Sequence, residues 1–201
     1  MIKAVIFDWG GVIAPNANEG WLNVLANILD TTADNLLPHW RAAGYSDLTK
    51  GFINEDIFWQ QFEKSLGKPL PKDLSRVWKE GSALNPWPEM LAFVKSLKDQ
   101  DKKVAILSNI VEPTVKMARA AGLYDGFEPI ILSNEVGLKK PNIEIYNLML
   151  DTIKIPANEC IYIDDMPENL IPAANLGMST ILSNPNDPSY TIESINQLMK
   201  S

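Results

Sequence analysis

The sequence predicts an α/β fold, namely a doubly wound parallel sheet with an all-helical segment inserted after the first strand. Two observations lead to this prediction. After residue 88, short apolar runs alternate regularly with helical segments, which is typical of βαβ units whose parallel sheet is covered on both faces. Residues 15–85 instead have apolar side chains at helical spacing, and all six tryptophans lie within the first 87 residues. This bias indicates a second, smaller core.

The first expected strand covers residues 5–7, inside the apolar run AVIF. The other strands are expected at residues 104–107, 129–132, 160–163 and 180–182. Helices are expected between and after them, at residues 89–101, 113–121, 142–153, 167–176 and 189–200. Prolines near the helix starts and glycines just past some of the helix ends favour these boundaries.

Residues 15–85 are expected to form three or four helices with a core of their own. The segment Asn85-Pro86-Trp87-Pro88 has the composition of a linker that returns the chain to the sheet. We therefore expect an α/β core domain of residues 1–14 and 86–201 and a helical domain of residues 15–85.

Composition excludes several classes of partner. The chain of 201 residues has a formal net charge of −7 and no block rich in Lys or Arg, so nucleic acid is not an expected partner. No apolar run approaches the ~20 residues of a membrane span, and the start, MIKAVIF, is too short for a signal peptide. With Cys160 as the single cysteine, the expected location is a reducing cytoplasm. Either a monomer or a homodimer fits this sequence.

The single histidine also limits the mechanism. His39 lies in the helical segment LLPHWRAA, beside an aromatic residue that packs well in a core. A Ser-His-Asp hydrolase or a His-rich zinc site would depend on this one side chain. We expect His39 to be a helix residue at an interface and not a catalyst.

Polar residues follow several of the predicted strands. Asp8 comes directly after the first strand, Ser108-Asn109 end VAILSN, and Asp164-Asp165 end CIYIDD, while Lys140 follows the strand ending in PIILSN. Because ligands of open α/β sheets bind at the carboxyl ends of the strands, we expect these side chains to share one crevice. Taken singly, each has an ordinary explanation as a turn, a helix cap or a surface charge.

This set of side chains suits phosphoryl transfer through a covalent intermediate. A carboxylate such as Asp8 can attack phosphorus and form an acyl phosphate, which divides one hard step into two. Mg²⁺ prefers oxygen ligands, which Asp8 and Asp165, supported by Asp164, would supply. Lys140 would orient Asp8 and offset phosphate charge, and the Ser108 hydroxyl would hydrogen-bond a phosphoryl oxygen.

The motifs FDWG, ILSN, GLKKP and IYIDDMPEN, in this order over nearly the whole chain, resemble those of the haloacid dehalogenase (HAD) superfamily. The resemblance implies a Rossmann-like core and identifies the inserted helices as a cap of that superfamily, whose residues shape substrate choice. It also implies roles for single residues. Asp8 would be the nucleophile and Lys140 the motif lysine, while Ser108 and Asn109 would bind phosphate. The Mg²⁺ ligands implied are Asp8, Asp164, Asp165 and the backbone carbonyl of Gly10. Trp9, next to the nucleophile, is a candidate for substrate contact as well as for packing.

The sequence departs from this family at Gly10. Phosphatases of the superfamily usually have Asp two residues after the nucleophile, where it protonates the leaving oxygen and activates water. Glycine can do neither, and acid–base catalysis of this kind typically contributes 10²–10⁴-fold. Glu19 and Glu55 are conceivable substitutes from the cap. The FDxGxV pattern is similar to that of a bacterial subgroup that includes sugar-phosphate phosphatases.

The expected function is therefore Mg²⁺-dependent hydrolysis of a small phosphorylated metabolite, with sugar phosphates as one candidate class. The main alternative is a catalytically weak binding or regulatory protein of the same fold, for which Gly10 argues. A 2-haloacid dehalogenase fits less well, because its pattern has an aromatic residue where Gly10 stands and lacks the pair Asp164-Asp165. A receiver domain has its acids in the reverse order along the chain.

Overall fold

A computed structural model describes residues 1–15 and 20–200. At its centre is a parallel sheet with the strand order β3-β2-β1-β4-β5. The strands are β1 (Ala4–Phe7), β2 (Lys103–Ser108), β3 (Ile130–Leu132), β4 (Cys160–Asp164) and β5 (Ser179–Leu182). The chain adds β2 and β3 on one side of β1 and then β4 and β5 on the other. The predicted doubly wound sheet is thereby confirmed, with β1 in its middle.

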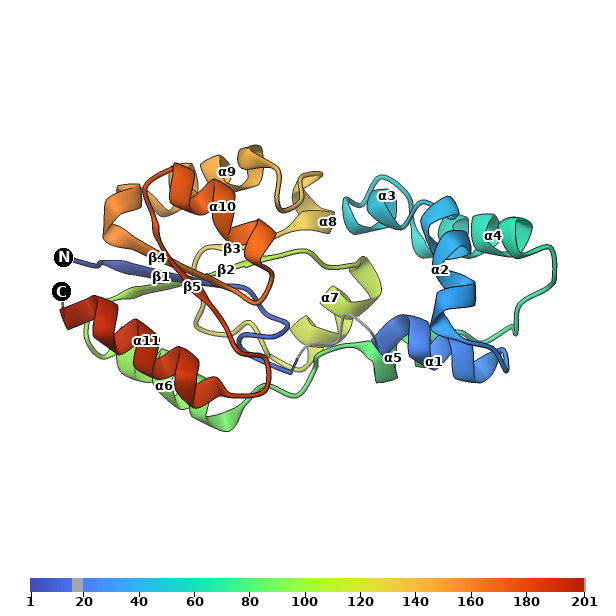
Figure 1. The fold of residues 1–201 in the computed structure, drawn as a ribbon, viewed down its shortest axis with the longest axis horizontal. Coiled ribbons are helices and arrows are strands. Elements are labelled where there is room, and N and C mark those ends of the chain that lie inside the picture. Colours follow the sequence, from blue (N-terminus) through green and yellow to red (C-terminus); the bar gives the residue numbers. More distant parts are fainter. Residues whose placement is uncertain (16–19, 201) are drawn as a thin grey trace.

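Helices cover both faces of this sheet. They are α6 (Pro88–Lys98), α7 (Glu112–Ala120), α9 (Ile143–Ile153), α10 (Pro167–Asn175) and α11 (Pro188–Lys200). Helices α6 and α11 lie on one face, and α9 and α10 lie on the other (Figure 1). Each face has its own cluster of buried apolar side chains.

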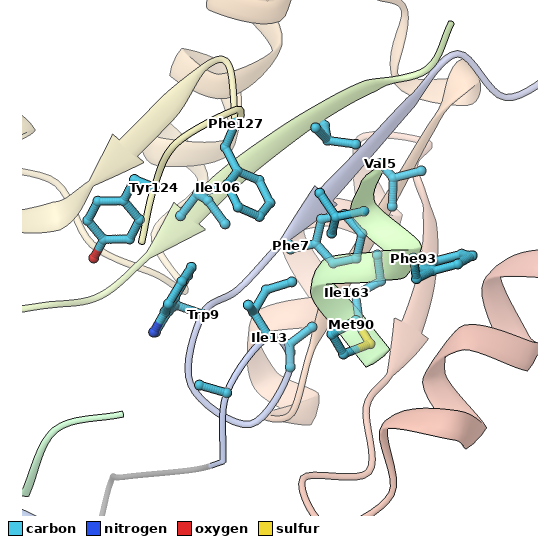
Figure 2. Packing of buried hydrophobic residues seen from close by; sticks show 14 of the residues in the cluster. Val5, Phe7, Trp9, Ile13, Met90, Phe93, Ile106, Tyr124, Phe127 and Ile163 are labelled. Atoms are coloured by element: carbon cyan, nitrogen blue, oxygen red, sulfur yellow. The ribbon is translucent and has the colours of Figure 1, made fainter. Parts of the chain in front are cut away.

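The strand β1 explains this division. Val5 and Phe7 belong to the cluster that includes side chains of α6 and α11, whereas Ala4 and Ile6 belong to the cluster that includes α9. Successive side chains of a strand point to opposite faces, so an uninterrupted apolar run serves both. Figure 2 shows Phe7 in the first cluster, where its ring meets that of Phe127 edge-on at 6.5 Å between centroids.

Of the six described helices between β1 and β2 in the chain, the first five lie beyond the carboxyl ends of the strands (Figure 1). They are α1 (Gly20–Ile28), α2 (Ala33–Ala42), α3 (Tyr45–Thr49), α4 (Glu55–Leu66) and α5 (Ser75–Gly81), and we call them the helical insertion. The sequence indicated three or four helices. The shorter ones, α3 and α5, have five and seven residues, which is too short for a clear 3.6-residue period.

The helical insertion has an aromatic core of its own. The Trp40 ring lies 4.8 Å from Phe58 and 5.9 Å from Trp78 between centroids, and Trp21 lies 5.4 Å from Trp78. Aromatic pairs such as the edge-on ones of Trp40 with Phe58 and of Trp21 with Trp78 add to the free energy gained by burying large rings. The enrichment of tryptophan in this part of the sequence therefore reflects a separate core.

The helical insertion also contacts the part of the chain that forms the sheet and its helices. Val111, just before α7, belongs to the core of the insertion. The Ser133 hydroxyl donates to the Thr49 carbonyl oxygen at 2.6 Å. Gly51 has φ +70°, and a Cβ added there would lie 2.1 Å from the Asn134 carbonyl oxygen. A side chain at position 51 would therefore push the two parts of the chain apart.

Two short elements complete the described chain. They are α8 (Ser133–Val136), which follows β3 directly, and the 3₁₀ turn η1 (Ala157–Glu159) before β4. The sequence did not indicate either, since each is at most four residues long. Among the described residues, no helix combines the length and the apolar character that crossing a bilayer requires.

Candidate active site

Asp8 stands directly after β1, at the carboxyl edge of the sheet. Its backbone N–H donates to the Ile163 carbonyl oxygen at 2.9 Å, which keeps it in register with β4. Its side chain is 9% exposed and accepts from the Trp9 N–H at 2.7 Å. The carboxylate is therefore fixed by the end of the strand and by the first bond of the turn that follows.

The turn after Asp8 requires glycine at position 11. Gly11 has φ +70°, and a Cβ added there would lie 2.5 Å from Cγ of Asp165. The Ser183 hydroxyl, from the end of β5, donates to the Gly11 carbonyl oxygen at 2.8 Å. The turn can thus approach the loop after β4 closely enough to bring Asp8 and Asp165 together.

Lys140 reaches this edge from the loop before α9. Its Nζ lies 2.9 Å from Oδ2 of Asp8 and 2.6 Å from Oδ2 of Asp164, and the side chain is almost fully buried. The amide of Asn109 holds the Lys140 backbone, donating to its carbonyl oxygen at 3.0 Å and accepting from its N–H at 2.9 Å. Asn109 therefore positions the lysine loop in this structure.

Asp164 is the most enclosed of the acids, with no exposed surface. Its Oδ2 accepts from Lys140 and from the Tyr162 hydroxyl, and its Oδ1 accepts from the Met166 N–H and the Asn169 amide, both at 2.9 Å. These four bonds use the usual acceptor directions of a carboxylate. Asp164 is therefore built into a fixed support for Lys140.

Burial and charge shift the pKa values of the site in different directions. Burial raises the pKa of Asp8, and this outweighs the lowering by Lys140. Burial lowers the pKa of the Lys140 ammonium, but the carboxylates of Asp8 and Asp164 together raise it above its ordinary value. Burial, helped by the charges of Asp8 and Asp164, raises the pKa of Asp165 to about 6.

Asp8, Asp164 and Asp165 can each offer an oxygen within 4.8 Å of the others, and they form the one acidic cluster of this kind among the described residues. The Lys140 ammonium lies against two of these carboxylates, those of Asp8 and Asp164. Such a set repels itself unless a cation is added, and its all-oxygen donors suit Mg²⁺. The residues present therefore fit a divalent metal ion.

A small cavity of about 50 Å³ opens beside Asp8. Its lining residues are Asp8, Trp9, Gly10, Trp21, Ala83, Ser108, Asn109, Ile110 and Thr114. Ser108, at the end of β2, hydrogen-bonds the Asp8 side chain and is buried. A Cβ added at Gly10 would have no heavy atom within 4 Å, so position 10 has free space on the side where a longer side chain would project.

Of the two substitutes considered for the acid at position 10, Glu55 is not among the residues that line this cavity. Glu55 lies in the helical insertion, where its Oε1 accepts from the indole N–H groups of Trp59 and Trp78. Glu19 lies outside the described residues. His39 contacts the Ser65 hydroxyl at 2.9 Å within the insertion, which agrees with its expected role in packing.

Sequence patterns did not identify the residues that support the site. Tyr162, Asn169 and Ser183 hold Asp164 and the Gly11 turn through side-chain hydrogen bonds. Tyr162 lies in an apolar strand, and Asn169 lies in a helix. The one available signal was their closeness in sequence to strand ends, which many structural residues share.

A protein-family model described as haloacid dehalogenase-like hydrolase matches residues 2–177. The chain belongs to this family. The resemblance of its four motifs is thereby confirmed, and the activity class is that of a hydrolase.

Three relatives illustrate the range of the HAD-like family. A sesquiterpene phosphatase of Aspergillus oryzae is 29% identical, covering 88% of this chain and 87% of its own length. Bifunctional epoxide hydrolase 2 of Sus scrofa is 37% identical over 90% of this chain, which spans 36% of that longer protein. A HAD family enzyme of Bacteroides thetaiotaomicron, crystallised with magnesium and inorganic phosphate, is 24% identical with a TM-score of 0.80, covering 95% and 99% of the two chains. This last likeness establishes the fold.

Proposed function

We propose that this HAD-like hydrolase cleaves small phosphomonoesters with Mg²⁺ and forms an aspartyl phosphate on Asp8. The observation that carries the proposal is the buried cluster in which the Lys140 ammonium lies between the carboxylates of Asp8 and Asp164, with Asp165 beside them. The sequence relative named as a phosphatase and the fold relative with magnesium and phosphate support the same class of substrate and the same metal.

In the first step, the Asp8 carboxylate attacks phosphorus while the bond from phosphorus to the leaving oxygen breaks, and the leaving oxygen takes a proton from water. Lys140 opposes the effect of burial on Asp8, because an ammonium at 2.9 Å favours the charged carboxylate. The Ser108 hydroxyl, beside Asp8, donates to a phosphoryl oxygen and helps to orient the group. Water then cleaves the aspartyl phosphate and returns the Asp8 carboxylate.

A Mg²⁺ ion held by the carboxylates of Asp8 and Asp165 and the carbonyl of Gly10 would neutralise charge on the phosphoryl oxygens. The sequence also predicted Asp164 as a metal ligand. Its four hydrogen bonds favour a different contribution, in which Asp164 fixes Lys140 and adds negative charge near the metal.

We also propose that the helical insertion works as a cap over the phosphate site. Trp21 from α1 and Ala83 from the segment after α5 line the cavity beside Asp8, so both ends of the insertion contribute to its walls. A cap that closes on the substrate would exclude bulk water from the aspartyl phosphate. The proposed boundaries remain those predicted, with residues 15–85 as the cap.

A binding or regulatory role is the second candidate, and Gly10 is the observation that favours it. Without a carboxylate at position 10, no side chain there can protonate the leaving oxygen. Such a protein would retain the metal and phosphate site while turning over slowly or not at all.

The test is hydrolysis of a panel of phosphomonoesters, sugar phosphates included, with and without Mg²⁺. We expect Mg²⁺-dependent turnover by the wild type and a loss of about 10³-fold or more in Asp8→Asn. Asp151→Asn, the same change at an exposed position on α9, is the matched control and should keep wild-type activity. Mg²⁺ binding without turnover of any panel member would favour the binding role instead.

A further inference from the structure

The cavity beside Asp8 has an apolar wall as well as the polar groups of Asp8 and Ser108. Trp9, Trp21, Ala83 and Ile110 contribute this wall. Trp9 is 3% exposed, Ile110 is 5% exposed and Trp21 is 9% exposed, so the wall is built from packed side chains. Whatever is attached to the phosphoryl group at Asp8 must lie against these groups.

The polar atoms of the two tryptophans are already engaged. The Trp9 Nε1–H donates to the Ala83 carbonyl oxygen at 2.6 Å, and the Trp21 Nε1–H donates to the Ser82 hydroxyl at 2.9 Å. An indole has a single donor. Both rings therefore offer only carbon to a bound molecule.

The remaining polar side chains of the wall are partly engaged as well. The Asn109 amide binds the Lys140 backbone through its oxygen and one N–H, which leaves its second N–H. The Thr114 and Ser82 hydroxyls lie 2.7 Å apart and hydrogen-bond one another. Because one of their two hydrogens makes that bond, the pair keeps one hydrogen for a ligand. Apart from the Asp8 and Ser108 end, the described side chains of this wall thus offer two donors.

We propose that the leaving group of the substrate is a short apolar alcohol and not a polyol such as a sugar. This inference rests on the proposed phosphomonoesterase function and specifies its substrate class. Each hydroxyl that enters an apolar wall gives up its bonds to water without replacement. With two donors among the described side chains of the wall, a leaving group with several hydroxyls gives up more bonds to water than these side chains replace, which costs roughly tenfold or more in binding.

The test compares two phosphonates of the same carbon chain, propylphosphonate and 2,3-dihydroxypropylphosphonate. Neither can be hydrolysed, so calorimetric binding to the Mg²⁺-loaded protein is measured independently of turnover. We expect propylphosphonate to bind at least about tenfold more tightly. Equal affinities, tighter binding of the diol, or no binding of either compound would overturn the proposal.

Two substitutions of Ile110 test whether this wall causes the preference for propylphosphonate. Thr and Val have nearly the same shape, so Ile110→Thr and Ile110→Val remove the same volume and differ by one hydroxyl. We expect the preference for propylphosphonate to be several-fold smaller in Ile110→Thr than in Ile110→Val, with thermal melting as the check on folding. The same preference in both variants would contradict the assignment of Ile110 to the leaving-group wall.

Turnover of propyl phosphate and of glycerol 1-phosphate separates this proposal from the more general one. Preference for glycerol 1-phosphate, with Mg²⁺-dependent turnover that needs Asp8, would overturn the apolar assignment and leave the phosphatase function intact. Tighter binding of propylphosphonate without turnover of either ester would support the wall assignment and overturn the proposed hydrolysis.

Discussion

Gly10 is the residue at which this chain departs from the phosphatase motif. Its side-chain position is open, since an added Cβ would have no heavy atom within 4 Å, and its φ lies outside the left-handed region. A larger residue is therefore compatible with the backbone. Position 10 therefore lacks an acid although the surrounding structure has room for one.

We predict that Gly10→Asp raises kcat by about tenfold or more, because a carboxyl group there can protonate the leaving oxygen. The gain should be largest for alkyl esters, whose leaving oxygens need a proton most. Steady-state kinetics on propyl phosphate measure it. Gly10→Asn, which has the same shape without an acid, is the control, and an equal gain in both variants would contradict an acid–base role.

Beside its proposed catalytic role, Lys140 has a structural effect, because it neutralises buried acids. We predict that Lys140→Met lowers the free energy of unfolding by about 3 kcal/mol, since Asp8 and Asp164 then remain buried without their partner. Adding Asp164→Asn should recover part of this loss. Denaturant unfolding of the metal-free protein measures both changes.

The control for this prediction is Lys139→Met. Lys139 is only partly buried, and its removal should change stability by no more than about 0.5 kcal/mol. A loss as large as that of Lys140→Met would show that loss of charge in this loop, and not the buried ion pairs, is responsible.

At the scale of elements, the hydroxyl of Ser133 at the start of α8 connects the helical insertion to the sheet. It donates to the Thr49 carbonyl oxygen and accepts from the Ile110 N–H at 2.9 Å, and the residue is fully buried. The insertion is thus held at this point by one buried side chain from the domain that contains the site.

We predict that Ser133→Ala costs about 2 kcal/mol, because a buried carbonyl oxygen and a buried N–H lose their partner. Hydrogen exchange should become faster around Thr49 and Gly51, where the insertion meets α8. Ser194→Ala is the control, since that hydroxyl bonds within α11 near the surface. Unchanged exchange near Thr49 would show that this bond does not hold the insertion.

At the scale of the whole molecule, the acidic cluster links stability to pH and to metal. The pKa of Asp165 is raised to about 6 by burial and by Asp8 and Asp164, whereas an unfolded aspartate has a pKa near 3.9. Between these values the metal-free folded state binds more protons than the unfolded state. The stability due to Asp165 is therefore greatest below about pH 4 and is lost as the pH rises through 6.

We predict that Asp165→Asn stabilises the metal-free protein at pH 7.5 by about 1 kcal/mol, a value reduced for solvent screening of a partly exposed carboxylate. The difference from wild type should shrink between pH 7.5 and pH 5. Excess Mg²⁺ should reverse the order by stabilising only the wild type. Thermal melting with a chelator and with Mg²⁺ checks this. Equal stabilisation of both proteins by Mg²⁺ would contradict the role of Asp165 as a ligand.

Much of this architecture could be predicted from the sequence, because it depends on local patterns. The run AVIF is apolar on both faces, which only a central strand of a covered sheet requires. The strand ends then placed Asp8, Ser108 and Asp164 at one edge, where the structure has them. The short helices α3 and α8 were missed, since four or five residues contain too little periodicity.

What the sequence by itself determined is the fold class and the set of polar groups at one sheet edge, because hydrophobic periodicity and motif order are properties of the chain. Only the tertiary structure decided which contacts each of these groups makes. Asp164 and Asp165 are neighbours in sequence, yet one is enclosed by four donors and the other faces Asp8 and Gly11. That difference depends on the contact of Asp164 with Lys140, 24 residues earlier in the chain, and on the fold of the segment after β4, which brings the Asn169 amide to Asp164.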